Sequence, residues 1–227
     1  MSKYVVELIG TFFLVLTVGC TVIAPGAGSF APLAIGASLM VMIFAGGHIS
    51  GGHYNPAVTI GVWLRGKCEA KDVLPYWASQ FIGAALAALV VRFFKGAPTS
   101  PAADLPVVPA LLAEFLFTFA LVYVVLNVAT AKGTGGNSFY GLAIGMTVTT
   151  GAYAVGNISG AAFNPAVALG VTFMGIANWS AIAVYWVAQF LAGAAAALVF
   201  KVVDPAYREE KLPVMSAGEA KSEAHAR

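Results

Sequence analysis

Apolar residues dominate the chain in long blocks that are separated by short clusters of charge, glycine and proline. A helix needs about 20 apolar residues to cross the hydrocarbon core of a bilayer. We therefore predict six membrane-spanning helices, placed at 4–24, 32–47, 75–94, 107–130, 138–155 and 178–202.

Two further apolar runs, within 49–71 and 159–174, are too short to cross a membrane. Short segments interrupted by glycine and proline, at corresponding places in two halves of a chain, are typical of re-entrant half-helices near the bilayer midplane. The predicted fold class is an all-α membrane protein with six transmembrane helices and two re-entrant half-helices.

The two halves of the chain repeat each other. Residues 46–62 and 155–171 match at ten of seventeen positions with an offset of 109, and 76–90 matches 185–199 at the same offset. Near the two starts, 6–16 resembles 113–123. Each half then holds three crossings, and because three is odd the second copy enters the membrane from the opposite side, which gives an inverted repeat.

This repeat also sets the domain organisation that we expect. The inverted repeats, at about 1–95 and 107–203, form one membrane domain over 1–203. Residues 204–227 are polar and carry both signs of charge, so we predict a disordered cytoplasmic tail there.

Composition agrees with a membrane protein and narrows its chemistry. Hydrophobic residues make up 59% of the chain and charged residues 10%, whereas about a quarter of the residues of soluble proteins are charged. No charged side chain occurs in 8–64 or in 133–200. A net charge of +2 gives no indication of a nucleic-acid partner, and Cys20 and Cys68 stand apart from any CxxC spacing, so we expect neither a metal site nor a cofactor.

Positive charge in the short loops predicts the orientation. With alternate crossings, one side of the membrane receives most of the basic residues, namely Lys3, Arg65, Lys67, Lys71, Lys132, Lys201, Arg208 and Lys211. The other side receives only Arg92 and Lys95. By the positive-inside rule both termini are cytoplasmic, and we expect a multi-pass protein of the cell (inner) membrane.

A three-residue motif opens each predicted half-helix, as Asn55, Pro56 and Ala57 and as Asn164, Pro165 and Ala166. Asparagine is a good N-cap, and proline suits the first helical turn because its missing N–H would be unpaired there. Two helix N-termini that meet at the midplane present partial positive charge and oppose cations. The amides of Asn55 and Asn164 can donate hydrogen bonds to a neutral solute, and a water molecule bound to both cannot relay a proton.

The loops before these motifs provide candidate acceptors. Their carbonyls lack helical partners and could line a solute path at Gly51, Gly52, His53, Gly160, Ala161 and Ala162. We favour a hydrogen-bonded structural role for the His53 ring over pH sensing.

The segments ELIGTFFLV, HISGGHYNPAVT and ISGAAFNPAV, with both NPA boxes, resemble the aquaporin (major intrinsic protein) family over residues 4 to 203. The resemblance implies a channel with one pore in each protomer, in a bilayer, assembled as a homotetramer. It also implies that Glu7 and Glu114 are buried carboxylates that support the re-entrant loops, which we favour over a proton relay.

The chain departs from the family at the outer constriction. Most members follow the second NPA box with arginine, and this chain has Val167. Counting from the motifs as in the family, the other selectivity-filter positions fall on Ile35, Ala152 and Ala161. The resemblance then implies a small, apolar and uncharged filter.

We expect this filter to pass water and small neutral solutes such as urea, hydrogen peroxide, ammonia or undissociated metalloid acids. A plain water channel and a glycerol facilitator remain alternatives, although Ala168 replaces the aspartate of the glycerol pattern. A secondary transporter would need a coupling carboxylate at the midplane. An ion channel is a further alternative, and without HExxH or paired catalytic side chains we do not expect an enzyme.

Overall fold

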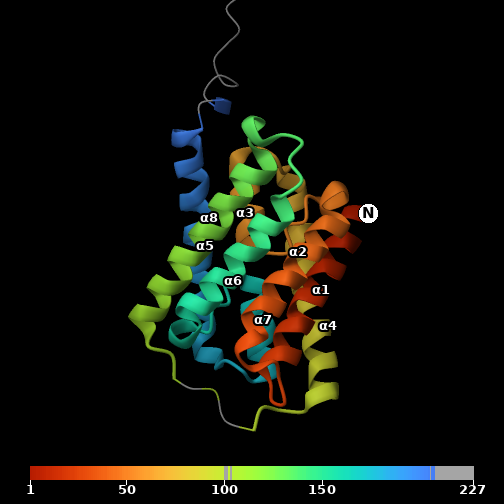
Figure 1. The fold of residues 1–227 in the computed structure, drawn as a ribbon, viewed down its shortest axis with the longest axis vertical. Coiled ribbons are helices and arrows are strands. Elements are labelled where there is room, and N and C mark those ends of the chain that lie inside the picture. Colours follow the sequence, from red (N-terminus) through yellow and green to blue (C-terminus); the bar gives the residue numbers. More distant parts are fainter. Residues whose placement is uncertain (100–101, 103, 205, 208–227) are drawn as a thin grey trace, which may run out of the picture.

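The computed structural model describes residues 1–99, 102, 104–204 and 206–207. Its regular structure in these residues is helical, in a bundle of roughly parallel long helices (Figure 1). The long helices are α1 (Ser2–Val22), α2 (Ala31–Ser50), α4 (Ala70–Lys95), α5 (Val107–Thr130), α6 (Tyr140–Ser159) and α8 (Ile182–Val203). Single 3-10 turns lie in the connections that precede α2, α6 and α8, at Gly28–Phe30, Lys132–Thr134 and Trp179–Ala181.

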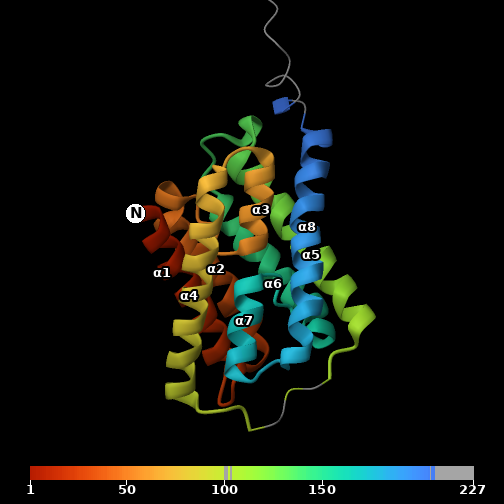
Figure 2. The same cartoon turned by 180° about the vertical axis from the view of Figure 1, so that it is seen from behind.

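Two short helices complete the bundle, α3 (Pro56–Arg65) and α7 (Pro165–Met174). Each has 10 residues and so spans about 15 Å, half of a hydrocarbon core. They lie in opposite halves of the molecule, and their N-terminal ends come together near its middle (Figures 1 and 2). The predicted fold class, with six long helices and two re-entrant half-helices, is confirmed.

The long helices that precede the half-helices are longer than predicted. α2 runs to Ser50 instead of 47, and α6 runs to Ser159 instead of 155. Both end at a glycine in the left-handed conformation, with φ 87° at Gly51 and 85° at Gly160. Glycine adopts this conformation without steric cost, so the chain can turn sharply toward the bundle interior.

The start of α4 was predicted at Pro75, but the helix begins at Ala70 and contains this proline. The added turn is held by Asp72, whose carboxylate lies 2.6 Å from Lys3 Nζ and accepts a 2.7 Å hydrogen bond from the Tyr4 hydroxyl. The sequence gives no sign of this contact, because the partners are almost 70 residues apart.

α2 and α6 cross at a pair of glycines that the repeat relates to each other. A Cβ atom on Gly36 would overlap Thr149 and the carbonyl of Gly145, and one on Gly145 would overlap the carbonyl of Gly36. Small residues allow helix backbones to approach closely in lipid, where hydrophobicity does not drive association. This crossing brings the central parts of the two repeats together.

Five of the described helices are long and apolar enough to cross a membrane, with mean hydropathies between 1.5 and 2.2. α6 is outside this group although it has 20 residues, because glycine and threonine replace larger apolar residues along it. It packs between α2 and α5 as the sixth long helix of the bundle.

The chain begins and α8 ends at the same end of the molecule (Figures 1 and 2). α3 also ends there, with Arg65, whereas Arg92 and Lys95 belong to the last turn of α4 at the opposite end. Most of the predicted tail, residues 208–227, lies outside the described residues, together with Arg208 and Lys211.

Candidate channel pore

The two Asn-Pro-Ala motifs cap the half-helices that they open. Asn55 Oδ1 accepts hydrogen bonds from the backbone N–H groups of Ala57 at 2.8 Å and Val58 at 3.4 Å. Asn164 Oδ1 accepts the equivalent bonds at 2.9 and 3.4 Å. Each asparagine is extended, with φ of −157°, and each proline occupies the first helical position. The side-chain oxygens therefore satisfy N–H groups that no helical carbonyl can reach.

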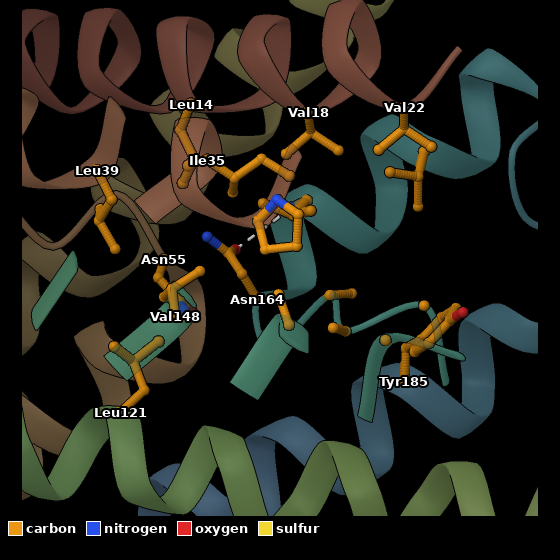
Figure 3. Close-up of a pocket in the computed structure, with 18 of the residues that line it drawn as sticks. Leu14, Val18, Val22, Ile35, Leu39, Asn55, Leu121, Val148, Asn164 and Tyr185 are labelled. Atoms are coloured by element: carbon orange, nitrogen blue, oxygen red, sulfur yellow. Dashed lines mark hydrogen bonds between the residues drawn. The ribbon is translucent and has the colours of Figure 1, made fainter. Parts of the chain in front are cut away.

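The asparagine amides also join the two re-entrant loops. Asn55 Nδ2 donates to the carbonyl of Phe163 at 2.9 Å, and Asn164 Nδ2 donates to the carbonyl of Tyr54 at 2.8 Å. A primary amide carries two hydrogens, so each side chain keeps one for another acceptor. Both side chains line the central cavity described below and lie in its middle in Figure 3.

Glu7 of α1 and Glu114 of α5, both fully buried, connect the loops to the long helices. Each accepts four hydrogen bonds, and the two sets match between the repeats. For Glu7 the donors are the Ser50 hydroxyl at 2.7 Å, the backbone N–H groups of His53 and Tyr54 at 2.9 and 2.6 Å, and Gln80 Nε2 at 2.8 Å. For Glu114 they are Ser159 at 2.7 Å, Ala162 and Phe163 at 2.9 and 2.7 Å, and Gln189 at 2.8 Å.

Several residues that support the re-entrant loops and half-helices were not predicted from the sequence. Tyr76 and Tyr185 donate to the carbonyls of Ser50 and Ser159 at 2.7 and 2.6 Å. The indoles of Trp77 and Trp186 donate to the carbonyls of Pro56 and Pro165 at 3.2 and 3.1 Å. A signal for them was present, because these residues and Gln80 and Gln189 belong to the repeated YWxxQF segment.

A central cavity of about 350 Å³ runs through the bundle past both asparagines. α1 contributes Leu14, Val18 and Val22 on one side, and Leu121 projects from α5 on the other (Figure 3). All four predicted filter residues line this cavity, namely Ile35, Ala152, Ala161 and Val167. Among the described residues, the wall of the central cavity is therefore largely apolar, with polar side chains at only a few positions.

The backbone of the re-entrant loops adds polar groups, the carbonyls, to this largely apolar wall. Gly52, His53, Gly160, Ala161 and Ala162 line the central cavity, and Gly51 lines a second one. Left-handed residues, with φ of 48° at Tyr54 and 54° at Ala161, keep these segments out of helical hydrogen bonding. Among the described residues no donor bonds to the six predicted carbonyls, so they remain available as acceptors.

The second cavity, of about 310 Å³, lies at the end of the molecule where α3 ends; we call it the mouth cavity. Charged side chains line it, namely Lys3, Lys67, Glu69 and Asp72. His53 and Val125 line both cavities. An apolar path with asparagines at its centre and a charged mouth, built inside a helical bundle, defines a membrane channel.

Comparison with known proteins gives the family. Residues 30–200 match the family model "Major intrinsic protein", so the chain belongs to this family. The family consists of channels and not of enzymes.

Curated relatives and a solved structure agree with this assignment. "Aquaporin NIP1-3" of Oryza sativa is 36% identical over 89% of this chain and 73% of its own length. "Glycerol uptake facilitator protein-like 6" of Lactiplantibacillus plantarum is 37% identical over 82% of this chain and 89% of its own. "Putative aquaporin NIP4-1" of Arabidopsis thaliana is 39% identical over 74% of this chain, but the match spans only 63% of its length. The aquaglyceroporin of Plasmodium falciparum has the same fold, with a TM-score of 0.73 at 21% identity over 89% of this chain and 96% of that chain.

Proposed function

We propose that this protein is a passive channel for water and small neutral solutes, including urea, hydrogen peroxide, ammonia and undissociated metalloid acids. One observation carries the proposal: the wall of the central cavity has Val167 where most family members have arginine. A solute path with an apolar, uncharged outer constriction excludes fewer neutral molecules than one narrowed by a guanidinium group.

The lining residues support a wide constriction. Ala152 and Ala161 carry only a methyl group, and Ile35 and Val167 are aliphatic. A solute that enters must exchange water for other partners, and the carbonyls of Gly160, Ala161 and Ala162 supply acceptors beside this apolar wall. Neutral molecules that donate hydrogen bonds and are not strongly hydrated meet these conditions.

Exclusion of cations then depends on the midplane. The N-terminal ends of α3 and α7 each carry about half of an elementary positive charge, directed at the middle of the path. The asparagine caps leave one amide hydrogen each for a passing solute. A cation would meet donors and positive potential there, whereas a neutral molecule would meet a hydrogen-bond partner.

Two other solute preferences remain alternatives. A plain water channel would use the same asparagines, and its filter would admit water but exclude urea. A glycerol facilitator finds support in the name of one relative, the L. plantarum protein, but Ala168 replaces the aspartate that accompanies the arginine in that pattern.

We also propose a homotetramer in the cell (inner) membrane with both termini in the cytoplasm. Lys3 and Lys67 line the cavity at the end where the chain begins, and Arg92 and Lys95 lie at the other end. This distribution of basic residues supports the orientation. Chemical cross-linking in native membranes tests the tetramer, and protease protection of terminal tags tests the orientation.

A solute panel on the purified protein in liposomes tests the proposed function. Stopped-flow light scattering should show faster flux than in empty liposomes for water, urea and ammonia, and a peroxide-sensitive dye should report peroxide entry. Flux should rise linearly with concentration and need no ion gradient. Water flux without any urea or peroxide flux would show that the protein is a plain water channel. Saturable flux coupled to an ion gradient would show that it is a transporter.

A further inference from the structure

The solute path consists of two cavities, which meet in the half of the pore that contains α3, away from the outer constriction. The central cavity includes both asparagines and all four filter residues without a break, so the outer constriction does not divide it. The division lies between the central cavity and the mouth cavity, and His53 and Val125 are the only described residues that line both. We call this place the neck.

Two residues of the outer constriction have identical counterparts at the repeat-related positions. Val167 is the repeat mate of Val58, and Ile35 is the mate of Ile144, at the offset of 109. All four residues line the central cavity. With valine at both 58 and 167 and isoleucine at both 35 and 144, the two halves of this cavity carry the same aliphatic side chain at these two pairs of positions. Among the described lining residues, the outer half has no charged side chain.

The repeat is broken at the neck. His53 and Thr59 correspond to Ala162 and Ala168 in the second half. The His53 Nδ1 lies 3.1 Å from the Thr59 hydroxyl, which also bonds to Gln80 Nε2 at 3.1 Å. The imidazole of His53 in this half of the pore therefore corresponds to the methyl group of Ala162 in the other half.

The ring of His53 is held firmly in place. Its centroid lies 5.0 Å from that of the Tyr76 ring, whose hydroxyl donates to the Ser50 carbonyl, and His53 as a residue is only 6% exposed. Because Nδ1 is engaged with Thr59, Nε2 is the remaining polar atom of the ring. Val125, on α5, adds methyl groups and no polar atom to the same boundary.

We propose that the neck of His53 and Val125, and not the outer constriction, sets the largest solute that the channel passes. This inference rests on the proposed function, because it concerns the same path. A neck with one fixed imidazole and one valine selects compact, unbranched neutral molecules that need few hydrogen bonds at a time. A methyl group that does not fit an apolar pocket changes selectivity about tenfold or more, so a single substitution at the neck should shift the size limit.

The test compares Val125→Ala with two matched substitutions. Val18 is the repeat mate of Val125 in α1, at the offset of 107 between Glu7 and Glu114, and it lines the central cavity but not the mouth cavity. Val122 lies one turn earlier on α5, is fully buried and lines neither cavity. Permeabilities for urea, methylurea and 1,3-dimethylurea are measured in liposomes by stopped-flow light scattering, and each is divided by the urea value, so that protein content cancels.

Val125→Ala should raise the dimethylurea-to-urea ratio about tenfold, and Val18→Ala and Val122→Ala should change it less than about twofold. His53→Ala, which copies Ala162, widens the neck from its other wall and should raise the ratio as well; it tests the inference if Val125→Ala does not fold. An unchanged ratio in both neck variants, or an equal rise in Val18→Ala, would overturn the inference. Absence of urea flux in the wild-type protein and in every variant would instead overturn the proposed function.

Discussion

Asn55 and Phe163, 108 residues apart in the chain, are joined by a hydrogen bond of 2.9 Å from Nδ2 of the asparagine to the carbonyl oxygen of the phenylalanine. Asn164 and Tyr54 form the repeat-related bond at 2.8 Å. The two half-helices are thus linked directly at their N-terminal ends. Each asparagine caps its own half-helix, bonds to the other repeat and lines the central cavity.

Asn164→Asp should weaken this link and admit cations. The substitution keeps the capping oxygen but removes the Nδ2 donor, so two oxygens face each other at the Tyr54 carbonyl, and loss of a buried partner costs about 1–3 kcal/mol. A carboxylate would also oppose the positive ends of α3 and α7. We expect a lower melting temperature in detergent and a sodium current in planar bilayers.

Asn127→Asp is the control for this substitution, because Asn127 Nδ2 bonds to the Tyr123 carbonyl at 2.8 Å within α5 and Asn127 lines neither cavity. A sodium current of equal size in both variants would show that cation exclusion does not depend on Asn164.

Glu7→Gln and Glu114→Gln should destabilise the protein to a similar extent. Each carboxylate accepts four hydrogen bonds, two of them from loop N–H groups, and a glutamine amide would direct a donor at other donors. The expected cost is about 2–4 kcal/mol in each case, since hydrogen bonds to charged groups are the stronger ones. Thermal unfolding of the two variants measures this. Unchanged stability together with lost proton flux would indicate a relay and not a support for the loops.

Gly36→Ala should disrupt the crossing of α2 and α6. The added methyl group overlaps Thr149 and the Gly145 carbonyl, and overpacking of this kind costs about 1–3 kcal/mol. Gly47→Ala, on the same helix, would place its methyl group 3.7 Å from the Tyr140 ring, an ordinary contact. We expect the first variant to unfold at a clearly lower temperature than the second, and equal melting temperatures would show that the close approach is not required.

Cys68 should react slowly with thiol reagents at neutral pH. Burial, followed by the nearby charge of Asp72, raises the pKa of the Cys68 thiol to about 11. The thiolate is the reactive form, and its fraction rises about tenfold per pH unit below the pKa. In a Cys20→Ser background, the reaction with Ellman's reagent should therefore be about 100-fold faster at pH 9.5 than at pH 7.5. A rate that levels off near pH 9 would contradict the raised pKa.

Much of the fold could be predicted because the responsible signals are local or repeated. The long apolar blocks located the long helices, and the two NPA boxes located α3 and α7. The sequence placed Ile35, Ala152, Ala161 and Val167 by counting from these boxes, and the structure brings all four to one cavity. Their role in selectivity stays a prediction.

The remaining features depend on contacts between distant parts of the chain. The early start of α4 follows from the pairing of Asp72 with Lys3, and no local pattern at 70–75 indicates it. Likewise, the neck follows from the packing of His53 against Tyr76 and from the position of α5, which brings Val125 to the same boundary. The repeat could have indicated the pairing of Gly36 with Gly145, since the two occupy equivalent positions.

The most direct test of the proposed function is urea permeability of the wild-type channel and of Val167→Arg in liposomes, with water flux measured on the same samples. Ala152→Leu, which narrows the constriction without adding charge, is the second variant. We predict that wild-type urea flux lies well above that of empty liposomes and falls about tenfold in Val167→Arg, an increase in barrier of about 1.4 kcal/mol, while water flux stays within about threefold. Urea and peroxide flux that is unchanged in both variants, at normal water flux, would contradict the account.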